Sequence, residues 1–408
     1  MKRRIRRPKK HSVYLKIGLF ALFSALVVLI TIAALYAVNY KPDVGSTPVS
    51  PYDDDTFSKV FGKLDDNGEV QETTPETKYE RTEIEDHTRR EGRYNFLILG
   101  RDRIALNTDV IMLMSLDTVN HTATIMQIPR DTYIEVGGTS YKLNALYASF
   151  VNQAKRGKSS DPYYDGMIGF TEAIQQNLYI KIDYWAVVNL AGFRNIVNML
   201  GGVEVDVPFD MDYDDPDQDL HIHLKAGYQT LDGDKAEQFI RFRSNYVQAD
   251  IGRINAQKIF LSAMLRKMKN AISIKTVATV SKAMLDYVLS SISVKDCAYF
   301  AKEALDLELQ NIKMFTMPGA DTRADGNAGA WYFVMNRTDM LALINEYFNV
   351  YNSQVTEKAF DSQLAFTDED RPHLNNIYRA KGTIDDPAEY GSSASGINQS
   401  SIDIPLLN

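Results

Sequence analysis

An uncharged and mostly apolar run at residues 17–38 constrains the fold of this chain more than any other feature. As a helix, its 22 residues would rise about 33 Å, which matches a hydrocarbon core about 30 Å thick. We therefore predict a transmembrane helix here. A cleaved signal peptide is the alternative, but the run is long for such a peptide and no A-x-A site follows it. A retained signal-anchor is the favoured interpretation.

The charges around this run predict its orientation. Residues 1–40 contain eight Lys or Arg and no acidic residue, and all eight lie in the basic tail at residues 1–16. The positive-inside rule then places the tail in the cytoplasm and the rest of the chain outside, as in a single-pass protein of the cell membrane. That remainder holds 37 basic against 53 acidic residues, a formal charge of −16. Such a body does not suit nucleic-acid binding, which requires broad neutralisation of phosphates.

The remaining organisation follows from composition and periodicity. Residues 41–93 are polar and read as an extracellular linker, residues 94–350 form one globular domain, and residues 351–408 are a polar tail that we expect to pack loosely from Gln354 onward. The single cysteine, Cys297, excludes an intramolecular disulfide and a cysteine-based metal site.

Strand and helix signals are mixed along the globular block. We predict strands at 94–99, 110–116, 123–128, 183–188, 203–207 and 313–317, and helices at 143–154, 166–178, 190–200, 254–268, 277–289 and 340–348. Gly201 and Gly202 are typical of the end of the third helix. This alternation favours an α/β fold with three layers, a mixed sheet carrying helices on both faces.

Two polar clusters downstream suggest a grip on phosphate, because guanidinium groups match phosphate oxygens with two parallel donors. The first is Arg241 and Arg243, which would share one side of an extended segment. The second is Asp250, Arg253 and Gln257, whose spacing places them on one helix face. An amphipathic edge strand and a solvated helix face are the simpler alternatives.

Carboxylates and cations near the predicted strand ends extend this picture. Asp102 and Asp109 lie near the two ends of one loop, and such oxygens suit a Mg²⁺ ion whose shell phosphate completes; the alternative is a turn residue and a strand-edge charge. Arg130 follows a strand, at the sheet edge where α/β proteins commonly bind ligands. Lys142 opens a helix, a position that suits anions.

A pair of histidines also raises the question of a metal site. His221 and His223 alternate along a predicted strand and would share one face. The sequence around them shows no third ligand at a recognisable spacing, so a metal site is not the favoured interpretation.

Taken together, these segments resemble the LytR-CpsA-Psr family of membrane-anchored cell-envelope proteins. The resemblance covers residues 94–349 and rests on an ordered combination of motifs. They are NFLILGRD at 95–102, TDVIM at 108–112, IPRDT at 128–132, KLNA at 142–145, LGGV at 200–203, RFR at 241–243 and DIGR at 250–253 with Gln257.

The resemblance implies an extracellular phosphotransferase, which moves a glycopolymer from a polyprenyl-pyrophosphate carrier to peptidoglycan through a phosphodiester. It implies Mg²⁺ held by Asp102 and Asp109, and an apolar cavity for the lipid. By position, the pyrophosphate and its reaction would be served by Arg130, Lys142, Arg241, Arg243, Arg253 and Gln257. Asp250 would orient an arginine or deprotonate the acceptor hydroxyl.

Two positions depart from the family pattern. The family usually has arginine before the Thr-Asp pair and a second arginine before the glutamine, where this chain has Asn107 and Ala256. Fewer positive charges weaken a phosphate grip. A non-catalytic module that senses polyprenyl phosphates is therefore the alternative function.

Overall fold

A computed structural model describes residues 40–44, 88–101, 106–136, 139–215, 220–242, 249–271, 287–323, 331–357 and 360, with no side chains for 249–255, 269–271, 305 and 320–323. The chain divides into two units, residues 1–43 and 44–408, and every described helix and strand belongs to the second. No helix within the described ranges is long and apolar enough to cross a membrane. The predicted membrane helix at 17–38 and most of the predicted linker lie outside these ranges.

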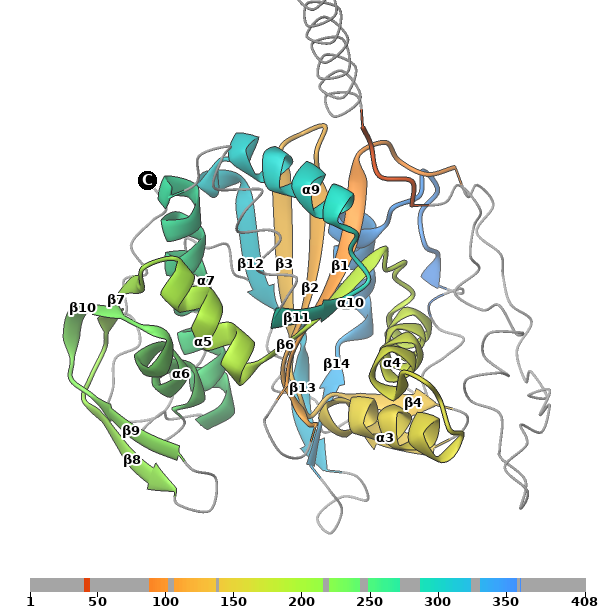
Figure 1. Ribbon diagram of the computed structural model, residues 1–408. Helices are drawn as coiled ribbons and strands as arrows, with labels where there is room; N and C mark the ends of the chain where they lie inside the picture. The colour runs from red at the N-terminus through yellow and green to blue at the C-terminus, as the bar shows by residue number, and fades with distance from the viewer. Residues whose placement is uncertain are drawn as a thin grey trace, which may run out of the picture. The chain divides into compact units, whose positions relative to one another are not determined.

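A mixed sheet of six strands forms the centre of the second unit, in the order β11-β6-β1-β2-β3-β12 (Figure 1). β1 pairs in parallel with β6 and β3 pairs in parallel with β12, whereas the other neighbours are antiparallel. The strands are β1 (Arg93–Arg101), β2 (Thr108–Asp117), β3 (Thr122–Ile128), β6 (Tyr184–Asn189), β11 (Val288–Ser290) and β12 (Ile312–Thr316). The prediction of a mixed α/β sheet is confirmed.

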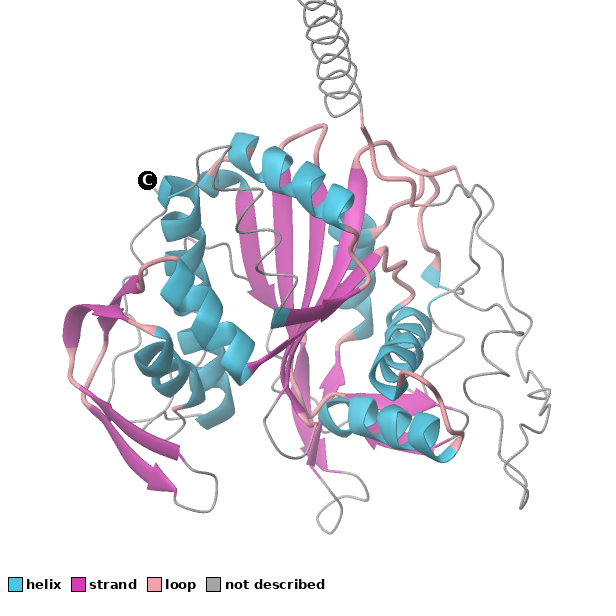
Figure 2. Cartoon of the chain, in the orientation of Figure 1, coloured by secondary structure: helices cyan, strands magenta, loops and turns pink. Residues whose placement is uncertain are grey.

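The two faces of this sheet pack against different helices, because strand side chains alternate between faces. Leu97 and Leu99 of β1 belong to a hydrophobic cluster with α3 (Leu143–Arg156), α4 (Pro162–Leu178) and α10 (Arg337–Leu343). Tyr94 and Phe96 belong to another cluster on the opposite face, to which α7 (Ala249–Ala271) and α9 (Val294–Asp306) contribute. The helices that cover the sheet can be followed in Figure 2. The core therefore lies on both sides of the sheet.

A second hydrophobic cluster lies beside the sheet and carries the arginine motifs. It is formed by α5 (Leu190–Met199), α6 (Gly233–Arg241), part of α7, and two antiparallel pairs of strands. These pairs are β7 (Val203–Val207) with β10 (Gly227–Leu231), and β8 (Met211–Asp215) with β9 (Leu220–Leu224). Gly201 and Gly202 follow α5 at φ of 75° and 85°, as predicted for the end of this helix.

Shorter elements complete the unit. The sequence patterns did not predict them, except for the last turn at 344–348, which lies within the helix predicted at 340–348. Two antiparallel pairs, β4 with β5 and β13 with β14, lie outside the central sheet. The remaining elements are β4 (Tyr133–Val136), β5 (Thr139–Lys142), η2 (Leu309–Asn311), β13 (Gly319–Arg323), β14 (Trp331–Met335) and the π-helical turn η3 (Ile344–Phe348).

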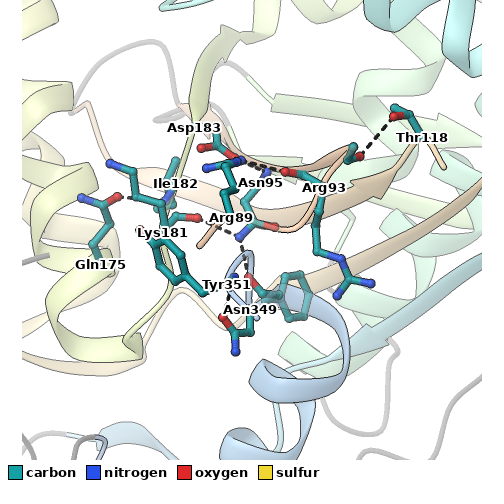
Figure 3. A network of polar contacts seen from close by, with 12 residues as sticks. Arg89, Arg93, Asn95, Thr118, Gln175, Lys181, Ile182, Asp183, Asn349 and Tyr351 are labelled. Atoms are coloured by element: carbon teal, nitrogen blue, oxygen red, sulfur yellow. Dashed lines mark hydrogen bonds and ion pairs between the residues drawn. The ribbon is translucent and has the colours of Figure 1, made fainter. Parts of the chain in front are cut away.

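A buried network of polar contacts, here called the polar clasp, joins Arg89, Asn95 and Asp183 (Figure 3). The Asp183 carboxylate accepts from the Arg89 guanidinium at 2.6 Å and from the Asn95 backbone N–H at 2.8 Å. The Asn95 side-chain amide donates to the carbonyls of Lys181 and Phe348, both at 2.7 Å. The clasp thereby connects β1 to the segment before β6 and to the end of η3.

The clasp also brings the beginning and the end of the domain together. Arg89 pairs with Tyr351 in an antiparallel bridge, and the Arg90 N–H donates to the Val350 carbonyl at 2.8 Å. Burial of Lys181 beside the clasp lowers the pKa of its amine. Residues on both sides of the predicted boundaries at 94 and 350 thus pack as one structure.

Three expectations about local structure are wrong. Arg241 ends helix α6 and does not lie in an extended segment, and Phe242, the residue after it, is buried. Val288 belongs to strand β11, although the pattern predicted a helix there. Loose packing from Gln354 onward is wrong for Val355 and Phe360, which are buried in the cluster that contains β1, while residues 358–359 and 361–408 lie outside the described residues. In each case long-range packing decides the local conformation.

Candidate anion-binding site

Three of the polar sequence motifs, those around Asp109, Arg130 and Lys142, lie close together at one end of the central sheet. Strand pairing places Arg101, the last residue of β1, opposite Thr108 at the start of β2. It also places Ile128, the last residue of β3, opposite Ile111 of β2. The residues that follow β3 and precede β2 are therefore neighbours, although about twenty positions separate them in the sequence.

Four charged side chains form what we call the sheet-end cluster: Asp109, Arg130, Asp131 and Lys142. The Arg130 guanidinium lies 2.9 Å from the Asp109 carboxylate and 3.6 Å from that of Asp131. The Lys142 ammonium lies 3.1 Å from Asp131. Two cations thus alternate with two carboxylates, and the prediction that Arg130 lies at a sheet edge is confirmed.

Backbone contacts hold the segment that carries Arg130. Pro129 ends β3, and the Thr132 hydroxyl donates to the Pro129 carbonyl at 2.6 Å. The Arg130 carbonyl accepts from the Asn144 N–H at 2.8 Å, in the first turn of α3. The position of Arg130 is therefore defined by the main chain on both sides, which limits the entropy lost when the side chain binds a ligand.

Lys142 stands at the N-cap of α3, as the sequence predicts. It also ends β5, and its ammonium lies 5.9 Å from the centre of the Tyr332 ring in β14. No acidic residue lies in the first turn of α3. The positive end of the helix dipole and the Lys142 charge therefore add in the same direction, toward an anion.

A second polar group lies between α6, α7 and β3. The Gln127 side chain of β3 donates to the Gln257 amide oxygen at 2.5 Å, and Gln257 donates to the Ile240 carbonyl at 3.3 Å. Arg241 follows Ile240 and lies 3.0 Å from the Glu237 carboxylate, one helical turn away. Gln257 thus connects the strand that leads to Arg130 with the helix that carries Arg241.

Glu237 lies at the centre of what we call the helix cluster, Arg194, Glu237 and Arg241. Its carboxylate is buried and accepts from Arg194 at 2.8 Å as well as from Arg241. Arg194 also lies 3.5 Å from the Asp234 carboxylate, so two guanidinium groups and two carboxylates balance one another here. The sequence already contained a signal for it, since Glu237 and Arg241 have the i, i+4 spacing of a helical ion pair.

The other predicted site residues fall outside the described side chains. Asp102 and Arg243 lie outside the described residues, while Asp250 and Arg253 are described only as backbone in α7. Their helix confirms the predicted conformation but does not test the predicted shared face. Ala256 is buried in the cluster formed by α5, α6 and α7, so the arginine usual in the family would meet apolar neighbours at this position.

Sequence reasoning also missed a buried lysine beside this group. Lys258 follows Gln257 in α7, and burial lowers the pKa of its amine to about 8. Nothing in the local pattern separates it from Lys267 of the same helix, which is only partly buried and pairs with Glu204. Only the packing of α7 identifies it.

The sheet-end cluster has the chemistry of an anion site. The side chains of its ion pairs are between 22 and 36% exposed, and such partly exposed pairs contribute only about 0–1 kcal/mol each. A phosphate offers Arg130 and Lys142 charge-assisted hydrogen bonds of the same kind as a carboxylate, so it can replace a carboxylate partner. Fold and site together define an α/β domain with a candidate anion-binding site at the end of its central sheet.

Comparison with known proteins gives this class a family. The model of the LytR_cpsA_psr family matches residues 60–349. The chain belongs to this family.

Relatives and solved structures agree with that assignment. The chain is 31% identical over 180 residues to the polyisoprenyl-teichoic acid–peptidoglycan teichoic acid transferase TagV of Bacillus subtilis, covering 43% of this chain and 42% of TagV. It is 30% identical over 195 residues to the enzyme of the same description, TagU, of Bacillus cereus, covering 47% and 57%. The matches thus span about half of each relative.

Two solved structures show the same fold. The crystal structure of B. subtilis TagV aligns with a TM-score of 0.51 and 25% identity, covering 62% of this chain and 94% of that one. The protein gbs0355 from Streptococcus agalactiae aligns with a TM-score of 0.52 and 21% identity, covering 66% and 94%. The second likeness concerns the fold alone.

Proposed function

We propose that this chain is a membrane-anchored extracellular transferase, which moves a glycopolymer from a polyprenyl-pyrophosphate carrier to peptidoglycan. The observation that carries the proposal is the sheet-end cluster, where Arg130 and Lys142 lie at a helix start in a chain of this family. The names of the relatives support both the lipid-linked donor and the peptidoglycan acceptor.

The proposed reaction is a phosphoryl transfer. An acceptor hydroxyl attacks the phosphorus that carries the polymer, and the bond from this phosphorus to the bridging oxygen of the pyrophosphate breaks. The polymer is then joined to the acceptor by a phosphodiester, polyprenyl phosphate leaves, and the hydroxyl proton passes to a base, for which Asp250 is the candidate. Such a reaction needs mainly positioning and neutralisation of charge.

Each cation has a role in this proposal. Arg130 binds two oxygens of one phosphate through its planar fork, and Lys142 adds a point charge beside it. Arg241, Arg243 and Arg253 neutralise the charge that develops on the transferring oxygens, and Gln257 orients the substrate. Charge neutralisation of this kind is worth roughly 10²–10³-fold in rate per donor.

Magnesium fits the donor atoms of this proposal. The Asp109 carboxylate is a hard oxygen ligand, 36% exposed at the sheet end and 2.9 Å from Arg130. Asp109 and Asp102 would hold the ion, which supplies charge neutralisation on the pyrophosphate when bound. An anchor at residues 17–38 would keep the domain beside a donor lipid that cannot leave the bilayer.

The test is transfer by the purified full chain in detergent, with a lipid-linked glycopolymer, peptidoglycan and Mg²⁺. We expect Arg130→Ala to lower kcat/KM by roughly 100-fold or more, because no other side chain replaces its bidentate contact. Arg130→Lys should recover only part of this loss. The matched control is Arg156→Ala, since Arg156 is an exposed arginine at the end of α3.

Metal dependence is measured in the same assay. Chelation of divalent ions should stop transfer, added Mg²⁺ should restore it, and Asp109→Asn should raise the Mg²⁺ concentration required. Full activity of Arg130→Ala would reject the assignment of the site. Tight binding of the lipid without transfer by the unmodified chain would favour the sensor function.

A further inference from the structure

The exposed face of the β8–β9 ribbon carries a cluster of metal-ligating side chains that the transferase chemistry does not use. Strand pairing places Asp214 opposite His221 and Asp212 opposite His223. The alternate residues of β9, Leu220, Ile222 and Leu224, are buried in the cluster with α6. The four polar side chains therefore share the outer face of the ribbon.

The distances within this cluster are those of direct polar contact. His221 Nδ1 lies 2.6 Å from Asp214 Oδ1, and His223 Nδ1 lies 2.7 Å from Asp212 Oδ1. The other ring nitrogen of His223, Nε2, lies 3.5 Å from Asp214 Oδ1. One ligand atom from each of Asp214, His221 and His223 can be chosen so that all three lie within 4.8 Å of one another.

His223 has a carboxylate oxygen at each of its two ring nitrogens. A neutral imidazole has one N–H, so its second nitrogen would turn a lone pair toward a negatively charged oxygen. A metal ion between them removes this repulsion. The geometry thus identifies where positive charge belongs, between His223 Nε2 and Asp214.

We propose that Asp214, His221 and His223 bind a first-row transition-metal dication of the Zn²⁺ type. Two imidazole nitrogens and one carboxylate oxygen are a common ligand set for tetrahedral Zn²⁺ with one open position. Asp212 would accept the Nδ1 proton of His223 and so orient the metal-bound ring, as carboxylates beside zinc-binding histidines do.

The chemistry of the ligands separates this site from the proposed Mg²⁺ site. Mg²⁺ prefers oxygen ligands, whereas imidazole selects Zn²⁺, Cu²⁺ and related ions. The three side chains are more than half exposed, so an ion enters without any opening of the core. Because the ligands come from both strands, the ion would link β8 to β9 and stabilise a ribbon that is marginal by itself.

The test uses the full chain in detergent, with any affinity tag removed and metal stripped by a chelator. Zn²⁺ is titrated in competition with a fluorescent zinc chelator, and thermal unfolding is followed with and without Zn²⁺. We expect one Zn²⁺ per chain to be lost in the double variant His221→Ala with His223→Ala. Asp212→Asn should weaken binding by roughly tenfold or more. His121→Asn, which changes an exposed histidine in the β2–β3 turn, should bind as the unmodified chain does.

Two further readouts keep the test decisive. Zn²⁺ should raise the Tm of the unmodified chain but not that of the double variant, and Mg²⁺ should neither compete for the site nor raise this Tm through it. If the double variant is misfolded by circular dichroism, Asp214→Asn replaces it. Absence of Zn²⁺ binding by the unmodified chain would overturn the proposal. Unchanged binding by the variants would overturn it as well.

Discussion

Lys258 loses its proton at a lower pH in the folded domain than in the unfolded chain. Burial lowers the pKa of its amine to about 8, against 10.5 for an exposed lysine. Between these values the unfolded chain binds more protons than the folded chain, so the free energy of unfolding rises with pH. The full shift corresponds to about 3 kcal/mol.

The expected measurement is therefore a pH series of urea unfolding. For the unmodified chain we expect the free energy of unfolding to increase from pH 8 to pH 10, by an amount up to that value. In Lys258→Met the increase should become smaller, because methionine has a similar volume and no proton to bind, while the lowered pKa of Lys181 still contributes. The same slope in both chains would show that another group causes it.

The sequence predicted some of the other site residues and missed others. Arg130 follows a predicted strand, and Lys142 opens a predicted helix. Local patterns were therefore enough to place both residues. Glu237 and Gln127 contribute through contacts with Arg241 and Gln257 that depend on how α6 and α7 pack on β3, and no local pattern contains that information.

The polar clasp shows how one side chain can connect several elements. The Asn95 amide donates two hydrogen bonds to buried main-chain carbonyls, those of Lys181 and Phe348. Asn95→Ala leaves both carbonyls without this donor, and each such loss costs about 1–3 kcal/mol. We expect a decrease of about 2–4 kcal/mol in the free energy of unfolding.

Chemical denaturation of the full chain checks this value. Asn152→Ala is the matched control, because Asn152 is exposed on α3 and should change stability by less than about 0.5 kcal/mol. A clasp variant as stable as this control would mean that water satisfies the two carbonyls equally well.

Among whole elements, the sequence predicted long periodic segments well and short ones poorly. The core strands β1, β2 and β3 and the helices α3, α4 and α5 carry clear apolar periods, so their existence followed from burial. β11 has only three residues, and its pairing with β6 overrides the local helical pattern. Asp214 lies opposite His221 because of the register between β8 and β9. A side-chain period of two predicts the face on which each residue lies, but not which residues of two strands are paired.

The packed core of the molecule extends beyond the family match, which ends at residue 349. Val350, Tyr351, Val355 and Phe360 belong to the same hydrophobic cluster as β1 and α3. The segment after the family match is therefore part of the core, at least to Phe360. The polar composition of the segment concealed this, because its buried residues at 350–357 and 360 alternate with polar ones.

Phe360→Ala measures that contribution. The side chain is 2% exposed, and removal of a buried phenylalanine costs about 3–5 kcal/mol. We expect a loss of this size in urea denaturation, and no comparable loss for Val119→Ala, which changes an exposed residue. Equal stability of both variants would place Phe360 outside the cooperative core.

The bridge between Arg89 and Tyr351 bears on the order in which the polypeptide is made. A ribosome releases the first strand long before its last partners, since β3 waits for β12 and Arg89 waits for a residue more than 250 positions later. Nascent chains that stop before residue 312 would lack an edge of the sheet and the bridge. Contacts of such long sequence separation form late, so the domain can be completed only after the segment up to residue 351 has been made.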